Sequence, residues 1–372
     1  MRDVISSGLG FGAMAAIGGK AVTAVGSALK SVKTSAVNAG MSFENAMSSV
    51  AAISGAAGTD FEKLSKKAEQ MGASTKYTAT EAADAMQYMA MAGWKTEDML
   101  SGIDGIMNLA AASGSDLAQT SDIVTDALTA FGKQAKDSGE FADVMAAASA
   151  NANTNVDLMG ETFKYVGSVA GAMGYSIQDI ALATGLMANS SVKGSAAGTA
   201  LRATITRMAK PTEESSMAMS ALGLSLTDAN GNMKSFGEIM KDMRKGMQGM
   251  TEDEKASYAA MLGGQEAMSG LLAIANASDE DFNKLSDAIN NAAGSAENMA
   301  DIKMDNLQGD VTKLQSSLEG LGITAFKQVS DNFRGFVQNI KNAVDELNQK
   351  LSDGKYIEKA IQWVEKLGSA FK

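Results

Sequence analysis

Cysteine and histidine are both absent from this chain. Disulfide bridges, cysteine nucleophiles and structural zinc fingers need cysteine, while Ser-His-Asp triads and histidine-bound zinc need histidine. These two absences exclude most hydrolases. A glycosidase with paired carboxylates stays compatible with the 43 acidic residues, but no pair among them is distinguished by its position. We therefore expect no enzyme activity, no cofactor and no metal site.

Proline and aromatic residues are scarce. Pro211 is the only proline in 372 residues, and aromatic residues make up 5% of the chain. So little proline favours long helices, while the 38 glycines are expected to interrupt or soften them. Apolar residues still amount to 45%, which argues against wholesale disorder. The composition predicts a mainly α fold, an elongated multi-helix assembly that packs through small residues and methionines.

Basic residues are fewer than acidic residues, 32 against 43, and the net charge is −11. This balance disfavours broad contact with nucleic-acid phosphates, so no specific nucleic-acid binding is expected. The first forty residues differ, because they hold four basic residues and one acidic residue. Their uncharged run, residues 4–19, is shorter than the roughly 20 residues that span a bilayer. We expect residues 1–40 to form a Gly/Ala-rich, apolar and slightly basic packing helix; the alternative is a membrane-active, pore-forming protein that inserts through this segment.

From Met41 onward, amphipathic helices alternate with capping residues. Thr78 is followed three positions later by Glu81, which is the spacing of a capping box. Acidic residues in the first turns complement the helix dipole, so they have a structural explanation before a functional one. Further helices are predicted at 138–150, 157–173, 176–188, 195–209, 266–276 and 279–293.

The segment 189–211 is the most distinctive. Gly194 and Gly198 are four residues apart with only Ser and Ala between them, so a helix here would let another backbone approach closely. An apolar face continues from Leu201, and Pro211 ends the segment. Phosphate binding by these glycines would need a following Gly-Lys-Ser or Gly-Lys-Thr, which is missing. The pattern favours a tight helix crossing.

One segment, 224–234, departs from helical patterning. Alternating apolar and polar residues lead to Asn230-Gly231, a typical two-residue turn, which predicts a small β-hairpin. Asp228, Asn230 and Asn232 also have the spacing of a calcium loop. Ile239 replaces the bidentate glutamate of such a loop, so the turn is the better interpretation.

The C-terminal part, residues 301–372, has apolar residues at coiled-coil spacing. The first run steps by 4, 3, 4 and 3 through Leu307, Val311, Leu314, Leu318 and Leu321, and the second run, after one shift in phase, contains Val329, Phe333, Phe336, Ile340, Ala343 and Leu347. Gly320 and Gly322 would form a soft joint between the runs. The spacing predicts a C-terminal coiled-coil-like helical segment that self-associates; amphipathic helices packed on the preceding bundle are the alternative.

Short motifs follow one another between about residues 60 and 280. They lie at 74–83, 109–117, 165–170, 174–176, 181–183, 194–202, 222–231 and 262–264, and the residues that stand out in or beside them are Thr78, Glu81, Gly174, Gly194, Gly198, Leu201, Arg202, Pro211 and Gly231. In this order the motifs resemble the core region of the tape measure proteins of long-tailed phages and prophages. The resemblance implies that these residues form a structural signature.

The resemblance also implies a function and a location. Tape measure proteins lie in the lumen of the tail tube, set tube length during virion assembly and are released on infection to assist genome delivery. The implied partners are the tail tube (major tail) protein, tail assembly chaperones and baseplate or initiator proteins, with the host membrane on ejection. The implied locations are the virion, the host cytoplasm during assembly and the host envelope during infection.

Chain length can be converted into tube length because a helix rises about 1.5 Å per residue, or about 560 Å for this whole chain. Members of the family are commonly longer, so we expect a fragment, a short-tailed variant or a tape measure protein of a phage-derived particle. Charge, composition and apolar spacing divide the chain into a Gly/Ala-rich N-terminal segment (1–40), a helical core (41–300) that contains the resemblance, and amphipathic or coiled-coil helices (301–372).

Overall fold

The computed structural model describes residues 20–352, and in this range every regular element is helical. The prediction of a mainly α-helical protein is therefore confirmed. In chain order the elements are α1 (Lys20–Ser54), α2 (Thr59–Ser74), α3 (Ala79–Met91), α4 (Thr96–Ser113), α5 (Leu117–Ala130), the short 3-10 helix η2 (Ala135–Asp137), α6 (Ser138–Asn151), α7 (Val156–Ala172), α8 (Ile177–Asn189), α9 (Gly194–Ala209), α10 (Glu213–Leu222), α11 (Phe236–Gly246), α12 (Glu252–Gly263), α13 (Gln265–Asn276), α14 (Asp279–Asn290), α15 (Ser295–Met304) and α16 (Leu307–Ser352).

The chain groups into two compact units. Within the described residues, one unit combines residues 20–42 with residues 321–352, and the other contains residues 43–320. The uncharged run at 4–19, on which the membrane-active alternative rests, lies outside the described residues. Among the helices of residues 20–352, none has the length and apolar character that crossing a bilayer requires.

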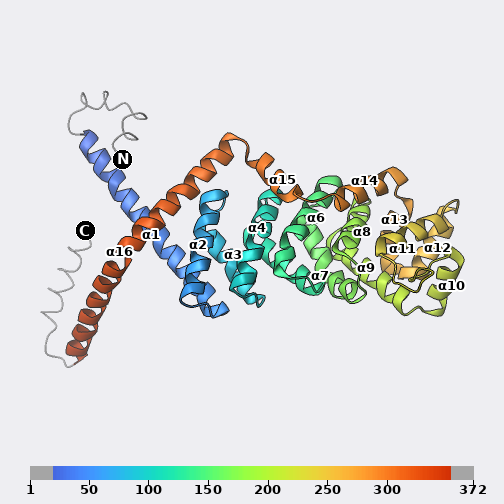
Figure 1. The fold of residues 1–372 in the computed structure, drawn as a ribbon, viewed down its shortest axis with the longest axis horizontal. Helices are drawn as coiled ribbons and strands as arrows, with labels where there is room; N and C mark the ends of the chain where they lie inside the picture. Colours follow the sequence, from blue (N-terminus) through green and yellow to red (C-terminus); the bar gives the residue numbers. More distant parts are fainter. Residues whose placement is uncertain (1–19, 353–372) are drawn as a thin grey trace. The chain divides into compact units, whose positions relative to one another are not determined.

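The larger unit is a stack of helical hairpins. In one layer α2, α4, α6 and α8 pack successively on one another, and in the other layer α3, α5, α7 and α9 do the same. The stack ends in α10–α13, where α13 packs on α8 and α9 (Figure 1). Because each hairpin contacts mainly its neighbours, the unit has the quasi-one-dimensional organisation of repeat proteins.

Residues 279–320, which we call the return segment, run back along one side of this stack (Figure 1). α14 packs on α8 and α6, and α15 packs on α6 and α4. The return segment therefore brings residues near 300 against helices that begin before residue 150.

Small residues allow the helices of the stack to approach closely. A Cβ atom at Gly105 in α4 would lie 2.6 Å from the backbone nitrogen of Gly139 in α6. Larger side chains fill the spaces between such crossings. Phe163, for example, lies between Phe131 and Phe141, with ring centroids 5.7 Å away in both cases.

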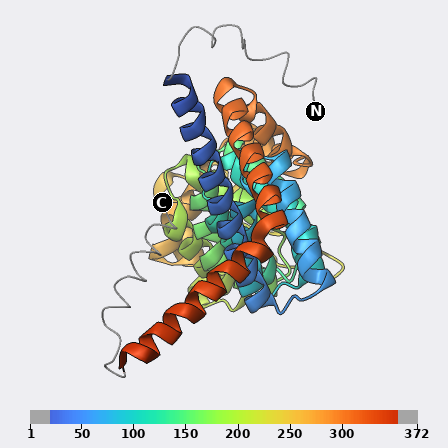
Figure 2. The same cartoon turned by 90° about the vertical axis from the view of Figure 1, so that its left-hand side faces the viewer.

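In the smaller unit, α1 and α16 cross each other (Figure 2). A Cβ atom at Gly322 would lie 3.1 Å from the Cα atom of Ala36, and Phe326 packs against Gly40. α16 continues as one helix of 46 residues through Gly320 and Gly322, so the expected joint is not a break in the helix.

The predicted β-hairpin at 224–234 is wrong. A single antiparallel bridge joins Thr227 to Met233, and residues 20–352 contain no strand. Two backbone hydrogen bonds flank this bridge, from Asp228 N–H to the Asn232 carbonyl oxygen and from Lys234 N–H to that of Leu226. Within the turn, the Asp228 carboxylate accepts hydrogen bonds from the backbone N–H groups of Asn230 and Asn232, at 2.8 and 2.9 Å. Such side-chain bonds to nearby backbone compete with a strand ladder.

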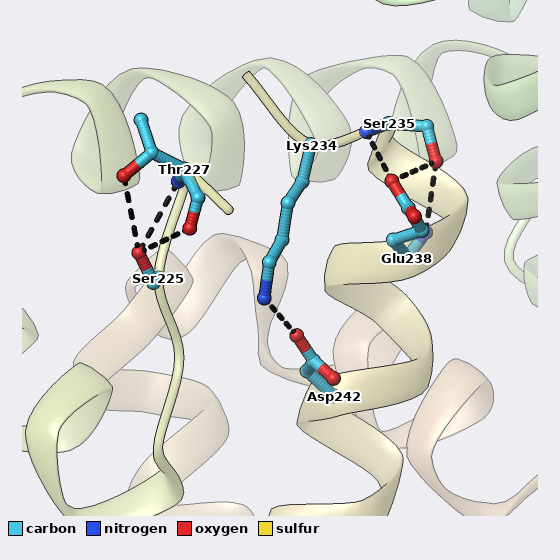
Figure 3. A network of polar contacts seen from close by, with 6 residues as sticks. All are labelled: Ser225, Thr227, Lys234, Ser235, Glu238 and Asp242. Atoms are coloured by element: carbon cyan, nitrogen blue, oxygen red, sulfur yellow. Dashed lines mark hydrogen bonds and ion pairs between the residues drawn. The ribbon is translucent and has the colours of Figure 1, made fainter. Parts of the chain in front are cut away.

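Side-chain contacts also keep both arms of this loop from extending into strands. On the first arm, the Ser225 hydroxyl bonds with Thr227 (Figure 3). On the second arm, Ser235 directly follows Lys234 and forms the capping box of α11 with Glu238, which starts a helix instead of a strand (Figure 3).

Candidate functional site

Gly198 lies where α9 crosses α7. A Cβ atom at position 198 would lie 2.6 Å from the carbonyl oxygen of Thr162 and 2.6 Å from the Cβ atom of Tyr165. Real Cβ atoms essentially never come this close to a neighbour. The crossing therefore depends on glycine at this position.

Gly194 starts α9 and ties its first turn to α7. Its φ of 57° falls in the left-handed region, and a Cβ atom here would lie 2.5 Å from a carboxylate oxygen of Glu161. The hydroxyl of Thr162, which is fully buried, lies 3.0 Å from the Gly194 carbonyl oxygen and 3.1 Å from that of Leu158. Thr162 thus donates either within α7 or across to α9.

The other signature residues of α9 point in different directions. Leu201 is fully buried, whereas Arg202 is exposed and lines a shallow groove of about 270 Å³ together with Thr199 and Thr206. α9 ends at Ala209, two residues before Pro211. Pro211 is followed by Thr212, which is the N-cap of α10.

The expected capping box at the start of α3 is present. The Thr78 backbone N–H donates to the Glu81 carboxylate at 2.8 Å, and the Glu81 backbone N–H donates to the Thr78 hydroxyl at 3.1 Å. The same helix end also meets the return segment. The Ser316 hydroxyl donates to the Lys76 carbonyl oxygen at 3.1 Å, and the Thr80 hydroxyl donates to the Glu319 carboxylate at 2.7 Å.

Gly174 and Gly231 both hold left-handed backbone conformations, with φ values of 76° and 83°. Gly174 follows α7 and lines a cavity of about 460 Å³ between the first turns of α8 and α11 and helix α14. Next to it, Tyr175 packs on Phe236, with ring centroids 5.3 Å apart. Burial raises the pKa of the Tyr175 hydroxyl to about 12, with a smaller effect from nearby Asp179.

Asp179 lines this cavity and accepts hydrogen bonds from the backbone at the start of two helices. One carboxylate oxygen accepts a hydrogen bond from the Ser176 N–H at the start of α8, and the other accepts from the Gly237 N–H in the first turn of α11, at 3.2 and 2.9 Å. The cavity is therefore bordered by helix ends whose amides already have a carboxylate partner. In residues 20–352, no cluster of three or more acidic side chains is arranged to hold a metal ion.

Several residues that organise these contacts were missed by the sequence analysis. Thr162, Asp179, Ser316 and Glu319 act on helix ends that are between 32 and 240 residues away in the chain. Asp179 had a local signal, because Ser176 and Asp179 have capping-box spacing. For Thr162, Ser316 and Glu319, no pattern in the sequence alone indicates the contact. The signature residues therefore contribute to helix packing, helix capping and turns of the chain.

Comparisons with known proteins agree with this structural character. A family model described as phage-related minor tail protein matches residues 65–264. The chain is 36% identical over 311 residues to the tape measure protein of Pneumococcus phage Dp-1, an alignment that covers 84% of this chain and 27% of that protein.

Two more distant relatives have similar descriptions. The chain is 26% identical to the probable tape measure protein of Escherichia phage P2, over 87% of this chain and 40% of that protein. It is 23% identical to the probable tape measure protein of Clostridium phage phiCD119, over 90% of this chain and 36% of that protein. The chain thus spans between 27% and 40% of the length of these three relatives. No solved structure matches it.

The resemblance found in the sequence is therefore confirmed. The matched range covers more than half of the chain and includes all nine signature residues, from Thr78 to Gly231. It supports a structural role in a phage tail and, with it, a place in the virion. On the strength of this match, the chain belongs to the phage-related minor tail protein family.

Proposed function

We propose that this chain acts as the core of a tail tape measure protein, which sets the length of the tail tube and leaves the tube on infection to assist genome delivery. The observation that carries the proposal is the similarity to relatives named tape measure protein, which extends over 84% to 90% of this chain. In this function the chain has no catalytic role. Its signature residues hold the hairpin stack together.

The architecture suits a ruler. A stack of hairpins grows along one direction, and α1 and α16 are helices of 35 and 46 residues. Since an α-helix rises about 1.5 Å per residue, α16 alone extends about 69 Å. Added or removed residues in such a helix change its length in proportion.

The partners in this function are the tail tube protein, tail assembly chaperones, baseplate or initiator proteins and further copies of the chain. Self-association is supported by α16, where the five residues of the first apolar run are exposed. Their exposed fractions are 78% for Leu307, 40% for Val311, 59% for Leu314, 57% for Leu318 and 67% for Leu321. Heptad-spaced side chains that are open to solvent on a long helix fit a coiled-coil seam.

The ruler is tested by changing the length of α16 in the phage gene. Residues 329–349 are 21 residues, or three heptads, so their deletion should shorten the tail by about 32 Å and their duplication should lengthen it by as much. Tail lengths are measured by electron microscopy. The matched control replaces the 21 residues with an unrelated helix of the same length and heptad pattern, and its tails should keep their length.

Unchanged tails in infectious particles that carry the duplication would remove the ruler role from this segment. The duplication decides the question if the deletion prevents assembly, because an inserted segment keeps every original residue.

A further inference from the structure

The return segment is anchored unevenly along its length. α14 buries Phe282, Leu285 and Ile289. In residues 291–320, by contrast, the buried residues are small: Ala292, Ala296, Ala300, Gly309 and Ser316. Five large apolar residues of this stretch, Ile302, Leu307, Val311, Leu314 and Leu318, are exposed, while Met299 and Met304 are half-buried. Because hydrophobic stabilisation grows with the apolar area removed from water, the side chains of residues 291–320 contribute less of it than those of α14, although their small size lets α15 pack closely on α4 and α6.

A helix cap supplied by the stack fixes the start of α15. Gly294 is the residue before this helix, and α15 has no side-chain cap of its own. The Asp143 carboxylate of α6 instead accepts hydrogen bonds from the backbone N–H groups of Gly294 and Ala296, at 2.8 and 2.9 Å. Unpaired N–H groups at a helix start are costly, so α15 relies on Asp143.

Three further side chains of this stretch contact helix ends of the stack. The Lys303 ammonium donates to the Ser113 carbonyl oxygen at the end of α4, at 3.1 Å. Ser316 and Glu319 contact Lys76 and Thr80 at the start of α3. Each of these contacts joins one side chain of residues 291–320 to the stack, so they can break without disturbing the helices that they join.

Backbone turns flank α15 on both sides. α14 ends at Asn290, and Gly294 then has a φ of 78°, in the left-handed region. On the other side, residues 305 and 306 separate α15 from α16. Changes of dihedral angle at 291–294 would let α15 turn away from α4 and α6, and residues 305 and 306 would let it turn relative to α16.

From this distribution we infer that residues 291–320 form a releasable strap, with Asp143 as its latch. In the described state α15 lies on α4 and α6 and the first part of α16 contacts the start of α3. The strap detaches as one unit, while α14 stays in place. Detachment frees the first part of α16 and uncovers the side of α4 and α6. The inference does not depend on the proposed function, although in a tail it would let α16 extend without unfolding the stack.

The first test is hydrogen exchange of the full chain, followed by mass spectrometry. The backbone N–H groups of residues 298–304 in α15 should exchange at least ten times faster than those of α14, and they should exchange at low denaturant concentration, below the transition of the whole stack. The strap is overturned if α15 exchanges as slowly as α14 and only together with global unfolding. The wild-type chain alone decides this point.

Two variants test the latch. Asp143→Ala should speed exchange in residues 298–304 by about tenfold, a typical effect of a lost helix cap, while α14 and α7 keep their rates. The matched control is Asp122→Ala, which removes the same charge from α5, where Asp122 pairs with Lys164 and not with the strap.

If Asp143→Ala accelerates α14 and α7 as much as α15, Asp143 supports the whole stack and the latch is refuted. Should that variant fail to fold, Lys303→Met gives the same test at an exposed contact. It should speed exchange in α15 and leave α14 unchanged, and equal acceleration of both would refute the inference.

Discussion

Replacing Gly198 with alanine tests whether the α7–α9 crossing is as tight as its geometry indicates. The new Cβ atom would lie 2.6 Å from two atoms of α7, one of them a backbone oxygen. Ordinary van der Waals contact begins at 3.4 Å, so the two helices would have to separate by 0.8 Å, the difference between these distances. Neither neighbour is the flexible end of a side chain, so the strain spreads into the packing of both helices.

Two opposing effects set the size of the change. Overpacking a close contact costs typically 1–3 kcal/mol, whereas alanine gains about 1 kcal/mol over glycine inside a helix. Since the clash is with helix backbone, we expect the cost to exceed the gain and Gly198→Ala to lower the free energy of unfolding by up to about 2 kcal/mol. For a unit of this size, that corresponds to a decrease in Tm of a few degrees.

Thermal and urea unfolding, followed by circular dichroism at 222 nm, measures this difference. The matched control is Gly139→Ala in α6, where nothing lies within 4 Å of the new Cβ atom. Only helix propensity acts there, so this variant should be as stable as the wild type or up to about 1 kcal/mol more stable. A Gly198→Ala variant as stable as the control would show that the crossing has room for a side chain and is not tight.

Two further substitutions test the helix start and the buried hydroxyl. Thr78→Ala removes the capping box of α3 and should lower the free energy of unfolding by about 1 kcal/mol, whereas Thr78→Ser should restore most of it; equal effects of the two would argue against the cap. The raised pKa of Tyr175, about 12, means that the folded state keeps this proton while the unfolded chain loses it near pH 10, so stability is full below pH 10 and declines between about pH 10 and 12. In Tyr175→Phe this decline should be smaller, and stability at pH 7 should not fall, since the Tyr175 hydroxyl is buried with no hydrogen-bond partner. An unchanged pH profile would show that Tyr175 does not titrate in this range.

The parts of the fold that follow from local sequence were predictable. Helices expected at 138–150 and 195–209 are observed at Ser138–Asn151 and Gly194–Ala209, because capping residues and apolar spacing act within one or two turns. The capping box of Thr78 and Glu81 formed for the same reason. The hairpin prediction was wrong at 224–234, where the side chain of Asp228 bonds to the backbone of the turn and the two arms form a single bridge.

The contacts that join distant parts of the chain were not predictable in the same way. Gly194 and Gly198 predict a close helix neighbour, but their spacing does not identify α7 as that neighbour. Nothing around Asp143 indicates that it caps a helix 151 residues later. Such pairings depend on which hairpins stack, and a single sequence carries no direct record of stacking order.

The contacts that local sequence does not predict also differ physically from the contacts within the stack. In the stack, glycine crossings and buried methionines join hairpins that are close in sequence, and each hairpin depends mainly on its neighbours. Residues 291–320 instead meet helices from the first half of the stack, through alanines and a few polar contacts at helix ends. Contacts between distant parts of a chain that bury little apolar area are the first to open, because little hydrophobic free energy opposes the gain in chain entropy. The stack should therefore persist when residues 291–320 leave it, so that one chain can combine a stable core with a helix that is free to extend.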